Sequence, residues 1–426
     1  MRLHRADRSS PRPRGPGEAQ PPITLVHVMT VPASLNFIQN QPDFLQSRGF
    51  ALRAITSPGE ALTRFAAEQR IAVDAVAMQR RITPFRDLVS LWRLYRTFRK
   101  IRPQVVHAHT PKGGLLGSLA AWLAGVPVRI YTIHGLPMMT AKGFKRKILR
   151  WTERISCRCA HRVLCVSRSI REVAVQERLC PAAKIEVLGH GSSTGVDAVG
   201  RFNPAQYVSE RQAIRRRHGI PEDALIVGYV GRIVRDKGMV ELAGAWQILR
   251  QRFPQLHLLL VGPFEPQDPV PGEVEAVLRT DPRVHLAGQT SDTPPYYAAM
   301  DVCVLPTYRE GLPVVPLEAA AMCVPVVATR IPGCLDAVVE DVTGLLVPPR
   351  DATALAGALA RLLGSPSLRE QLGRAGRQRV LRDFRPETIC QALYDQYLGL
   401  LEDKGLCAPR AERAEAPDSV EGRRAA

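Results

Sequence analysis

Short apolar runs alternate with helical stretches along most of this chain, and the alternation occurs in two separate blocks. In the first block, runs rich in Val, Ile and Leu lie at residues 23–29, 51–57, 73–78, 104–110, 128–134, 162–167 and 184–189. Continuous apolar strands that alternate with helices are typical of a parallel sheet covered on both faces. The first block therefore predicts a doubly wound α/β domain.

The pattern stops over residues 191–204, "GSSTGVDAVGRFNP", and then starts again. This segment is rich in Gly and Ser and predicts a linker between domains. Further strand-like runs lie at 224–230, 256–262, 284–288, 301–306, 324–329 and 344–349. Helices are expected at 351–363, 366–382 and 386–402. The sequence thus predicts two Rossmann-like, doubly wound parallel-sheet domains in tandem, with their ligand sites beyond the carboxyl ends of the strands.

A chain of 426 residues is long enough for two such domains. We expect the first domain to span residues 23–203 and the second to span 204–385. Residues 1–22 are rich in Arg and Pro and read as a disordered basic tail, and residues 403–426 as a second disordered tail.

The chain carries a strong positive charge, with 58 Lys and Arg against 40 Asp and Glu, or +18. This charge indicates an anionic partner, which could be a membrane surface, a phosphorylated substrate or nucleic acid. Two basic helical stretches stand out, at 84–100 and 142–162. We expect no nucleic-acid partner, because no recognition motif accompanies these cations.

The second basic stretch has a regular pattern, with a cation at every fourth residue and an apolar complement between them. The cations are Lys142, Arg146, Arg150, Arg154, Arg158 and Arg162, and the apolar residues are Ile148, Trp151, Ile155 and Cys159. Like charges at this spacing repel one another, so a counter-anion is expected. Docking on anionic lipid head groups is one interpretation, and ordinary solvated helix faces are the other.

Several classes of protein are not indicated. No segment reads as a secretory signal, and no run approaches the roughly 18 apolar residues of a membrane span, so we expect a cytoplasmic protein whose membrane contact is peripheral. The nine cysteines are scattered, and Cys157 and Cys159 lack a second pair at zinc spacing. No Asp-x-Asp pair is present to hold Mg²⁺, so no metal is expected.

Candidate site residues lie directly after strands of the second block. "GYVGRIVRDKG" (228–238) contains Arg232 and Lys237. Arg offers a bidentate fork and Lys a point charge, which together suit a diphosphate. A solvated turn is the alternative. The segment is neither a dinucleotide fingerprint nor a P-loop.

"YREGLPVVPLEAAA" (308–321) follows another strand and holds Glu310 and Glu318. Pro residues favour the first turn of a helix here, so the amides of Gly311 and Leu312 are expected to form an anion site at its N-terminus. A carboxylate can accept hydrogen bonds from both hydroxyls of a ribose. The pair could instead perform acid/base catalysis, or belong to an ordinary amphipathic helix.

The first block offers weaker candidates at its strand ends. These are Ser34 in "HVMTVPASLNF", Lys112 in "HTPKGGLLGS" and His134 in "YTIHGLP". A structural histidine and a helix-capping serine are the alternatives for His134 and Ser34.

Taken together, these motifs resemble a family 4 retaining glycosyltransferase of the GT-B fold. "GRIVRDKG", "LLLVGP", "AAMDVCVLPTYREGLPVVPLEAAAMCVPVVAT" and "GLLVPPRD" occur in the order that this family shows. "HAHTPKGGLLGSLAAWLAGVPVRIYTIHGLP" and "GHGSSTGVDAVGRFNP" resemble the capsule and exopolysaccharide branch. The resemblance departs from the usual pattern at Thr194, where Asn is usual, and at Gly113, where Ala is more usual.

The resemblance implies a role for each candidate residue. Catalysis would rest on Glu310, His134, Arg232 and Lys237. The donor would be held by Arg232, Lys237, Glu310, Gly311, Leu312 and Glu318, with Glu318 on the ribose and Glu310 on the transferred sugar. Ser34, Lys112 and His134 would lie on the acceptor side, in the first domain. The second domain would bind the nucleotide-sugar across the cleft, and the helix at 386–402 would cross back to the first.

The implied reaction moves a sugar from a UDP-sugar, often N-acetylated, to a saccharide on a polyprenyl-diphosphate carrier. It would serve capsule, exopolysaccharide or O-antigen biosynthesis at the inner face of the cell membrane, with no cofactor besides the co-substrate. The alternatives are transfer to a soluble small molecule, a sugar epimerase and an inactive, membrane-associated assembly partner.

Overall fold

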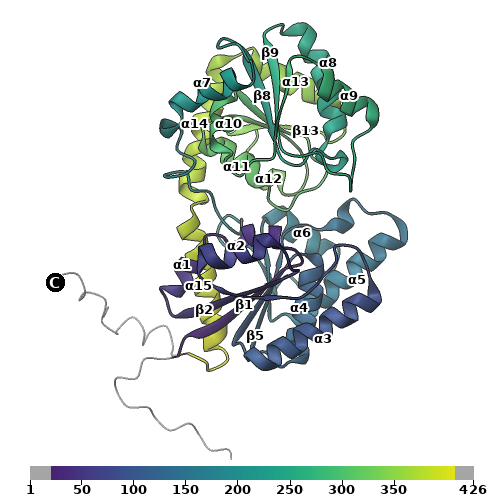
Figure 1. Cartoon of the computed structure of the whole chain (residues 1–426), viewed down its shortest axis with the longest axis vertical. Coiled ribbons are helices and arrows are strands. Elements are labelled where there is room, and N and C mark those ends of the chain that lie inside the picture. The colour runs from purple at the N-terminus through teal and green to yellow at the C-terminus, as the bar shows by residue number, and fades with distance from the viewer. Residues whose placement is uncertain (1–20, 408–426) are drawn as a thin grey trace, which may run out of the picture.

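The computed structural model describes residues 21–407, which form two α/β domains stacked end to end (Figure 1). The expectations for the tails fall almost wholly on residues 1–20 and 408–426, which lie outside the described residues.

The N-terminal domain is built on a seven-stranded parallel sheet with the order β3-β2-β1-β4-β5-β6-β7. Its strands are β1 (Ile23–Val28), β2 (Phe50–Thr56), β3 (Ala72–Ala75), β4 (Val105–His109), β5 (Val128–Ile133), β6 (Arg162–Cys165) and β7 (Ile185–Glu186). The helices between them are η1 (Pro32–Ile38), α1 (Pro42–Gln46), α2 (Glu60–Gln69), α3 (Pro84–Ile101), α4 (Pro111–Leu123), η2 (Pro137–Met139), α5 (Gly143–Cys159) and α6 (Arg168–Gln176).

The C-terminal domain repeats this plan on a six-stranded parallel sheet with the order β10-β9-β8-β11-β12-β13. Its strands are β8 (Leu225–Val230), β9 (Leu256–Val261), β10 (Val284–Gly288), β11 (Val302–Leu305), β12 (Val326–Thr329) and β13 (Gly344–Val347). The helices are η3 (Pro204–Gln206), α7 (Val208–Arg217), η4 (Arg235–Lys237), α8 (Met239–Arg252), α9 (Gly272–Thr280), α10 (Pro294–Ala299), α11 (Val314–Ala321), α12 (Cys334–Ala337), α13 (Ala352–Leu363) and α14 (Pro366–Asp383).

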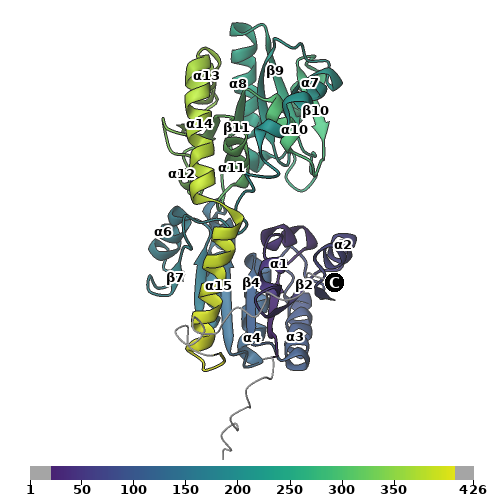
Figure 2. The ribbon, with the colours of Figure 1, turned by 90° about the vertical axis from the view of Figure 1, so that its left-hand side faces the viewer.

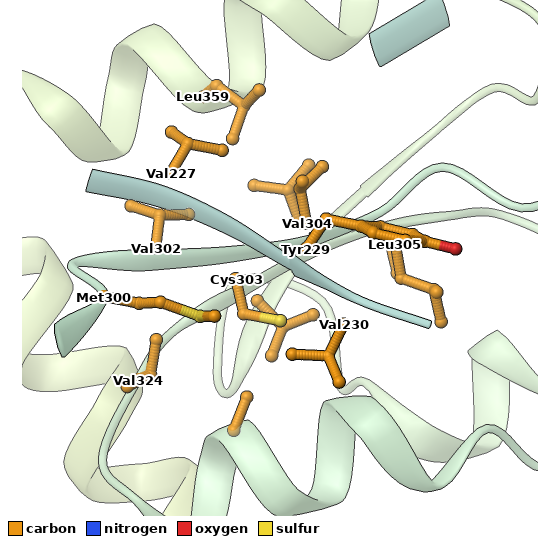
Figure 3. Close-up of a cluster of buried hydrophobic side chains, with 14 of the residues drawn as sticks. Val227, Tyr229, Val230, Met300, Val302, Cys303, Val304, Leu305, Val324 and Leu359 are labelled. Carbon is orange, nitrogen blue, oxygen red and sulfur yellow. The ribbon is translucent and has the colours of Figure 1, made fainter. Parts of the chain in front are cut away.

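Both faces of the C-terminal sheet are buried, which explains its continuous apolar strands. Figure 3 shows side chains of β8 and β11, among them Val227 and Val304, packed between helices. Val227 pairs with Val302 across the two strands, and both are almost fully buried.

The last helix, α15 (Pro386–Glu402), packs on the N-terminal domain. Its residues Leu393, Tyr397 and Leu401 share one apolar core with Leu25 and Phe50. Figure 2 shows α14 along the C-terminal domain and α15 continuing along the N-terminal one. The structure thus confirms the α/β fold class, with two Rossmann-like parallel-sheet domains that face each other.

The strand order reverses between β1 and β4 in one sheet and between β8 and β11 in the other. Ligands of such sheets bind beyond the carboxyl ends of the strands at these switch points. The segments that follow these four strands therefore define where the site should lie.

Candidate active site

Arg232 and Glu310 flank the switch point of the C-terminal sheet, because Arg232 follows β8 and Glu310 follows β11. Gly238, at the start of α8, has a φ of 73°. A side chain there would collide with the carbonyl of Pro306, so this turn packs tightly against the end of β11. The fold thereby places η4, which contains Lys237, next to the Glu310 loop.

Lys237 and Glu310 form an ion pair between Nζ and Oε1. Their side chains are mostly enclosed, with exposed fractions of 20% and 14%. The residue expected to hold a diphosphate and the residue expected to hold the sugar are thus in direct contact. A diphosphate bound here would compete with Glu310 for the ammonium group.

Arg232 lies about half exposed and pairs with Glu265, whose Oε2 is 2.8 Å from the Nη1 of Arg232. Glu265 follows β9, the neighbour of β8 in the sheet. Arg232 therefore has a partner that keeps it at the edge of the cleft, and it retains donors for an anionic ligand.

The amides of Gly311 and Leu312 donate no hydrogen bond to another described residue. Helix α11 begins only at Val314 with Pro313 as its N-cap, so both amides lie in the loop before the helix. Gly311 is buried, and buried backbone N–H groups nearly always have a partner. An anionic or hydroxyl-bearing ligand would supply one.

Glu318 is the fifth residue of α11 and accepts a hydrogen bond from the phenol of Tyr297, 2.7 Å from its Oε2. Burial raises the pKa of Glu318, and the Tyr297 hydrogen bond opposes that rise. Tyr297 is fully buried, so it fixes the rotamer of the carboxylate. The arrangement suits a carboxylate that binds hydroxyls better than one that shuttles protons.

The two domains meet at Gly311. The Ser167 hydroxyl donates to its carbonyl oxygen at 2.7 Å, and a side chain at residue 311 would collide with the carbonyl of His134. Only glycine permits this approach, which brings the Glu310 loop against the N-terminal domain.

Asp336 of α12 adds a second contact between the domains. Its carboxylate accepts from the amide of Arg168 at 2.8 Å and from that of Ser169 at 3.2 Å, at the N-terminus of α6. A carboxylate at this end of a helix satisfies free amides and complements the helix dipole.

His134 follows β5 and lies beside the Gly311 contact. Its ring stacks on Phe37 with centroids 4.0 Å apart, and its Nε2 lies 2.9 Å from Nδ1 of His109. Burial lowers the pKa of His134 to about 3, so the ring is neutral at neutral pH.

Ser34 and Lys112 line one cavity of about 740 Å³ in the N-terminal domain. Lys112 is held by Asp87 at 2.8 Å. The other cations of the wall are Arg80, Arg81, Lys145 and Arg309. Arg309 comes from the loop before Glu310, so the cavity adjoins the donor-side loop, while His134 is not part of its wall.

The exposed surfaces of α3 and α5 carry large apolar side chains as well as cations. Phe85, Leu88, Val89 and Trp92 of α3 are exposed by 50–87% and recur at helical spacing. Trp151 of α5, one of the apolar residues between its cations, is 64% exposed. The buried residues of this helix are Glu153, Ser156, Cys157 and Cys159, and only Cys159 belongs to that apolar set.

Part of the negative charge that balances the cations at every fourth residue of α5 comes from the same domain. Glu177 pairs with Arg146 at 2.6 Å and with Arg150 at 3.1 Å. The backbone carbonyl of Arg178 accepts from Arg154. These arginines therefore serve contacts within the domain, whereas Lys145 and Lys147 remain exposed.

Two known families match the chain, one in each domain. Residues 224–365 match the family described as "Glycosyl transferases group 1", and residues 43–191 match the "Glycosyl transferase 4-like domain". A capsular polysaccharide biosynthesis glycosyltransferase, CapM of Staphylococcus aureus, is 34% identical over 89% of this chain and 98% of its own. The chain belongs to the group 1 glycosyltransferases. This result confirms the family, the GT-B fold and the capsular branch expected from the motifs.

A second relative of this glycosyltransferase is more distant. The UDP-Gal:alpha-D-GlcNAc-diphosphoundecaprenol alpha-1,3-galactosyltransferase of Escherichia coli is 25% identical over 90% of this chain and 98% of its own.

Solved structures confirm the fold. A glycosyltransferase from Rickettsia africae superposes with a TM-score of 0.73 at 18% identity, covering 90% of this chain and 99% of its own. Anabaena HepE, solved in complex with UDP, gives 0.72 at 19% identity over 89% of this chain and 100% of its own.

Several residues that position the candidate site carry no motif of their own. Tyr297, Glu265 and Asp336 contact their partners from distant parts of the sequence, and each is an ordinary residue type for its local element. His109 belongs to the run "HAH", which indicates a strand but does not reveal which side chain its ring contacts. Only the fold brings these residues to the site.

Proposed function

We propose that this glycosyltransferase moves a sugar from a UDP-sugar to a saccharide carried on polyprenyl diphosphate, with retention of the anomeric configuration. The observation that carries the proposal is the Lys237–Glu310 pair beside the free amides of Gly311 and Leu312. With Arg232 across the switch point, these groups offer two cations and two N–H donors for a diphosphate. Glu310 then contacts the sugar, and Glu318 the ribose.

The chemistry follows from where the charge develops. The bond between the anomeric carbon and the diphosphate oxygen breaks, and the acceptor hydroxyl attacks the same face. Arg232, Lys237 and the two amides stabilise the leaving negative charge. The leaving diphosphate accepts the acceptor's proton, so the mechanism needs neither a metal nor a covalent nucleophile. His134 lines the cleft from the N-terminal domain.

The acceptor assignment is supported by the cavity that holds Ser34 and Lys112. Its cations suit a diphosphate, and its apolar wall of Leu115, Ile148 and Leu149 suits a lipid chain. The name of the Escherichia coli relative states that it acts on a sugar linked to diphosphoundecaprenol. A soluble acceptor has no lipid chain to contact this apolar wall.

Peripheral binding to the inner face of the cell membrane is part of the proposal. Among residues 21–407, no helix has the length and apolarity needed to cross a bilayer. The exposed face of α3, with Phe85 and Trp92, lies next to exposed Arg93 and Arg96, and Arg96 stacks over Trp92 at 4.8 Å. Exposed aromatics beside cations are typical of helices that lie in the interface of an anionic membrane.

The function is tested by measuring UDP release over a panel of UDP-sugars, with and without a polyprenyl-diphosphate-linked saccharide. We expect release from one donor that depends on the lipid-linked acceptor. Equal release with a soluble sugar would favour the small-molecule alternative. Acceptor-independent release with a free, altered sugar would indicate an epimerase, and no release from any donor would favour an assembly partner.

Membrane binding has its own test. We expect flotation with vesicles that contain anionic lipid, weakened by salt and by the double substitution Phe85→Ser and Trp92→Ser. The matched control is Trp122→Ser, because Trp122 is 54% exposed but belongs to a different helix, α4. Binding that did not depend on salt, on lipid charge or on the α3 double substitution would contradict the proposal.

A further inference from the structure

Three histidine rings form a hydrogen-bonded line from the interdomain contact into the N-terminal sheet. His134 Nε2 lies 2.9 Å from His109 Nδ1, and His109 Nε2 lies 3.0 Å from His27 Nδ1. His27 and His109 are buried on the neighbouring strands β1 and β4, whereas His134 is partly exposed beside Gly311. At the inner end, His27 Nε2 is buried and has no hydrogen-bond partner among the described residues.

A fourth ring, His107, lies beside this line but is bonded elsewhere. Its Nδ1 is 2.7 Å from the Tyr397 hydroxyl, and its Nε2 is 2.6 Å from Oγ1 of Thr132. His27, His107 and His109 are close enough together to hold a metal ion. However, both nitrogens of His107 and of His109 are already engaged, so hydrogen bonding accounts for the cluster without a metal.

All of these rings are neutral at neutral pH. Burial lowers the pKa of His27 and His134 to about 3, and it lowers the pKa of His107 and His109 well below the ordinary value. A neutral imidazole has one N–H and one bare nitrogen. Each contact between two rings needs one of each, so the tautomer of one ring dictates that of the next.

The line therefore has two self-consistent states. If every ring carries its proton on Nε2, His27 is left with a buried N–H that has no acceptor. If every ring carries its proton on Nδ1, His27 is left with a bare nitrogen instead. Orphaned buried N–H groups are rarer in proteins than under-satisfied acceptors, which favours the second state.

The outer end of the line then follows. His134 Nδ1 has no hydrogen-bond partner among residues 21–407, and unlike His27 Nε2 it is not fully buried. We propose that His27 and His109 are positioning residues that hold His134 in its Nδ1–H tautomer, so that its ring offers a hydrogen-bond donor at the interdomain cleft. The tautomer is a property of the chain itself; only the ligand that accepts this bond, a hydroxyl or phosphate oxygen, rests on the proposed function.

The test is nitrogen NMR of the full chain labelled with ¹⁵N-histidine, in which ring shifts identify each tautomer without any activity measurement. His134 is assigned with His134→Gln. His27→Asp replaces the donor to His109 by a carboxylate, which accepts a hydrogen bond from the Nε2–H of His109, while His27→Asn returns an amide N–H near the Nδ1 position. His107→Leu is the matched control, because His107 is equally buried, is the register partner of His27, and lies outside the line.

We expect His134 as the Nδ1–H tautomer in the native chain, in His27→Asn and in His107→Leu. In His27→Asp we expect the Nε2–H tautomer, because each ring then donates its proton toward residue 27. In the transfer assay, we expect kcat of His27→Asp to fall about tenfold below that of His27→Asn, the effect of losing one directed hydrogen bond, with KM for the donor little changed.

Three results would overturn the proposal. The first is an Nε2–H tautomer of His134 in the native chain, which decides the matter even if His27→Asp does not fold. The second is an equal change of the His134 signal in His107→Leu. The third is stoichiometric Zn²⁺ binding that shifts the His27 and His109 signals, because a metal would take nitrogens that the line uses.

Discussion

At the scale of single residues, the site depends on side chains whose partners fix their charge and rotamer. Glu318 is the clearest case, because its carboxylate is enclosed and accepts a hydrogen bond from Tyr297 at 2.7 Å. A hydrogen bond to a charged group contributes about 1.5–3 kcal/mol. The phenol therefore holds the Glu318 carboxylate in place and opposes the burial that raises its pKa.

Replacing Tyr297 by Phe tests this role. We expect affinity for UDP, measured by calorimetry, to fall about threefold to tenfold, because Glu318 loses its directing bond. We expect kcat to change little, because Glu318 is placed on the ribose. Tyr296→Phe is the control, since the Tyr296 hydroxyl makes no hydrogen bond with a described residue. Equal affinity in both variants would contradict the role.

The buried histidines predict how stability depends on pH. Burial lowers the pKa of His27 from 6.5 to about 3. Between these two pH values, the unfolded chain binds a proton at His27 and the folded chain does not. The stability contributed by neutral His27 is therefore complete above pH 6.5 and is lost as pH falls toward 3. Glu153 acts in the opposite sense, because burial raises its pKa to about 7.

Comparing the native chain with His27→Leu isolates this contribution. Between pH 6 and pH 4, we expect the slope of unfolding free energy against pH to decrease by up to about 1.4 kcal/mol per pH unit in the variant. Urea unfolding at several pH values measures it. An unchanged slope would show that His27 is not buried in its neutral form.

Sequence reasoning reached some of these residues and not others, for a physical reason. Arg232, Lys237, Glu310 and Glu318 follow strand ends, and strand ends are visible in the apolar pattern. Tyr297, Glu265 and His109 act through contacts that depend on which strands are neighbours. Neighbours in a doubly wound sheet are not consecutive in sequence, so no local pattern reveals such pairs.

At the scale of elements, the apolar runs located all thirteen described strands, and the errors lie at their ends. β7 is only two residues long, although a run of six was expected at 184–189, because it is an edge strand with one neighbour. Helix α5 was located, and its buried face is mostly polar, with Glu153 and Ser156 beside Cys157 and Cys159, so the apolar pattern does not reveal that face.

The loop before α11 makes the sharpest prediction at this scale. We expect Gly311→Ala to lower kcat about 10²-fold, because a Cβ there collides with the carbonyl of His134 and displaces the Glu310 loop by a fraction of an ångström or more. Gly357→Ala is the control, since Gly357 lies exposed in α13 with nothing near its Cβ position. That change should stabilise the chain by about 0.5–1 kcal/mol and leave turnover intact. Full activity in Gly311→Ala would show that the contact is not needed.

At the scale of the whole molecule, the two domains are held by α15 on one side and by polar contacts at the cleft on the other. Asp336 caps α6 across the interface, whereas Asp351 caps α13 within the C-terminal domain, accepting from the Ala354 amide at 2.8 Å. Each carboxylate caps a helix N-terminus, but only the Asp336 cap links the two domains.

This pair allows a matched prediction. Replacing either aspartate by Ala should cost about 1 kcal/mol of stability in chemical unfolding. Only Asp336→Ala should also increase the radius of gyration in solution scattering and raise KM for the donor, because it loosens the domain contact. Identical scattering of the two variants would contradict a role for Asp336 in holding the cleft closed.

The central claim is that a sugar passes from a UDP-sugar to a lipid-linked saccharide within this cleft. The most direct measurement follows a labelled sugar into the organic phase with a synthetic polyprenyl-diphosphate saccharide as acceptor, and then determines the anomeric configuration of the new bond by NMR. We expect label in the lipid phase, with the α configuration of an α-linked donor retained in the product. Label that stays in the aqueous phase, or a product with inverted configuration, would contradict it.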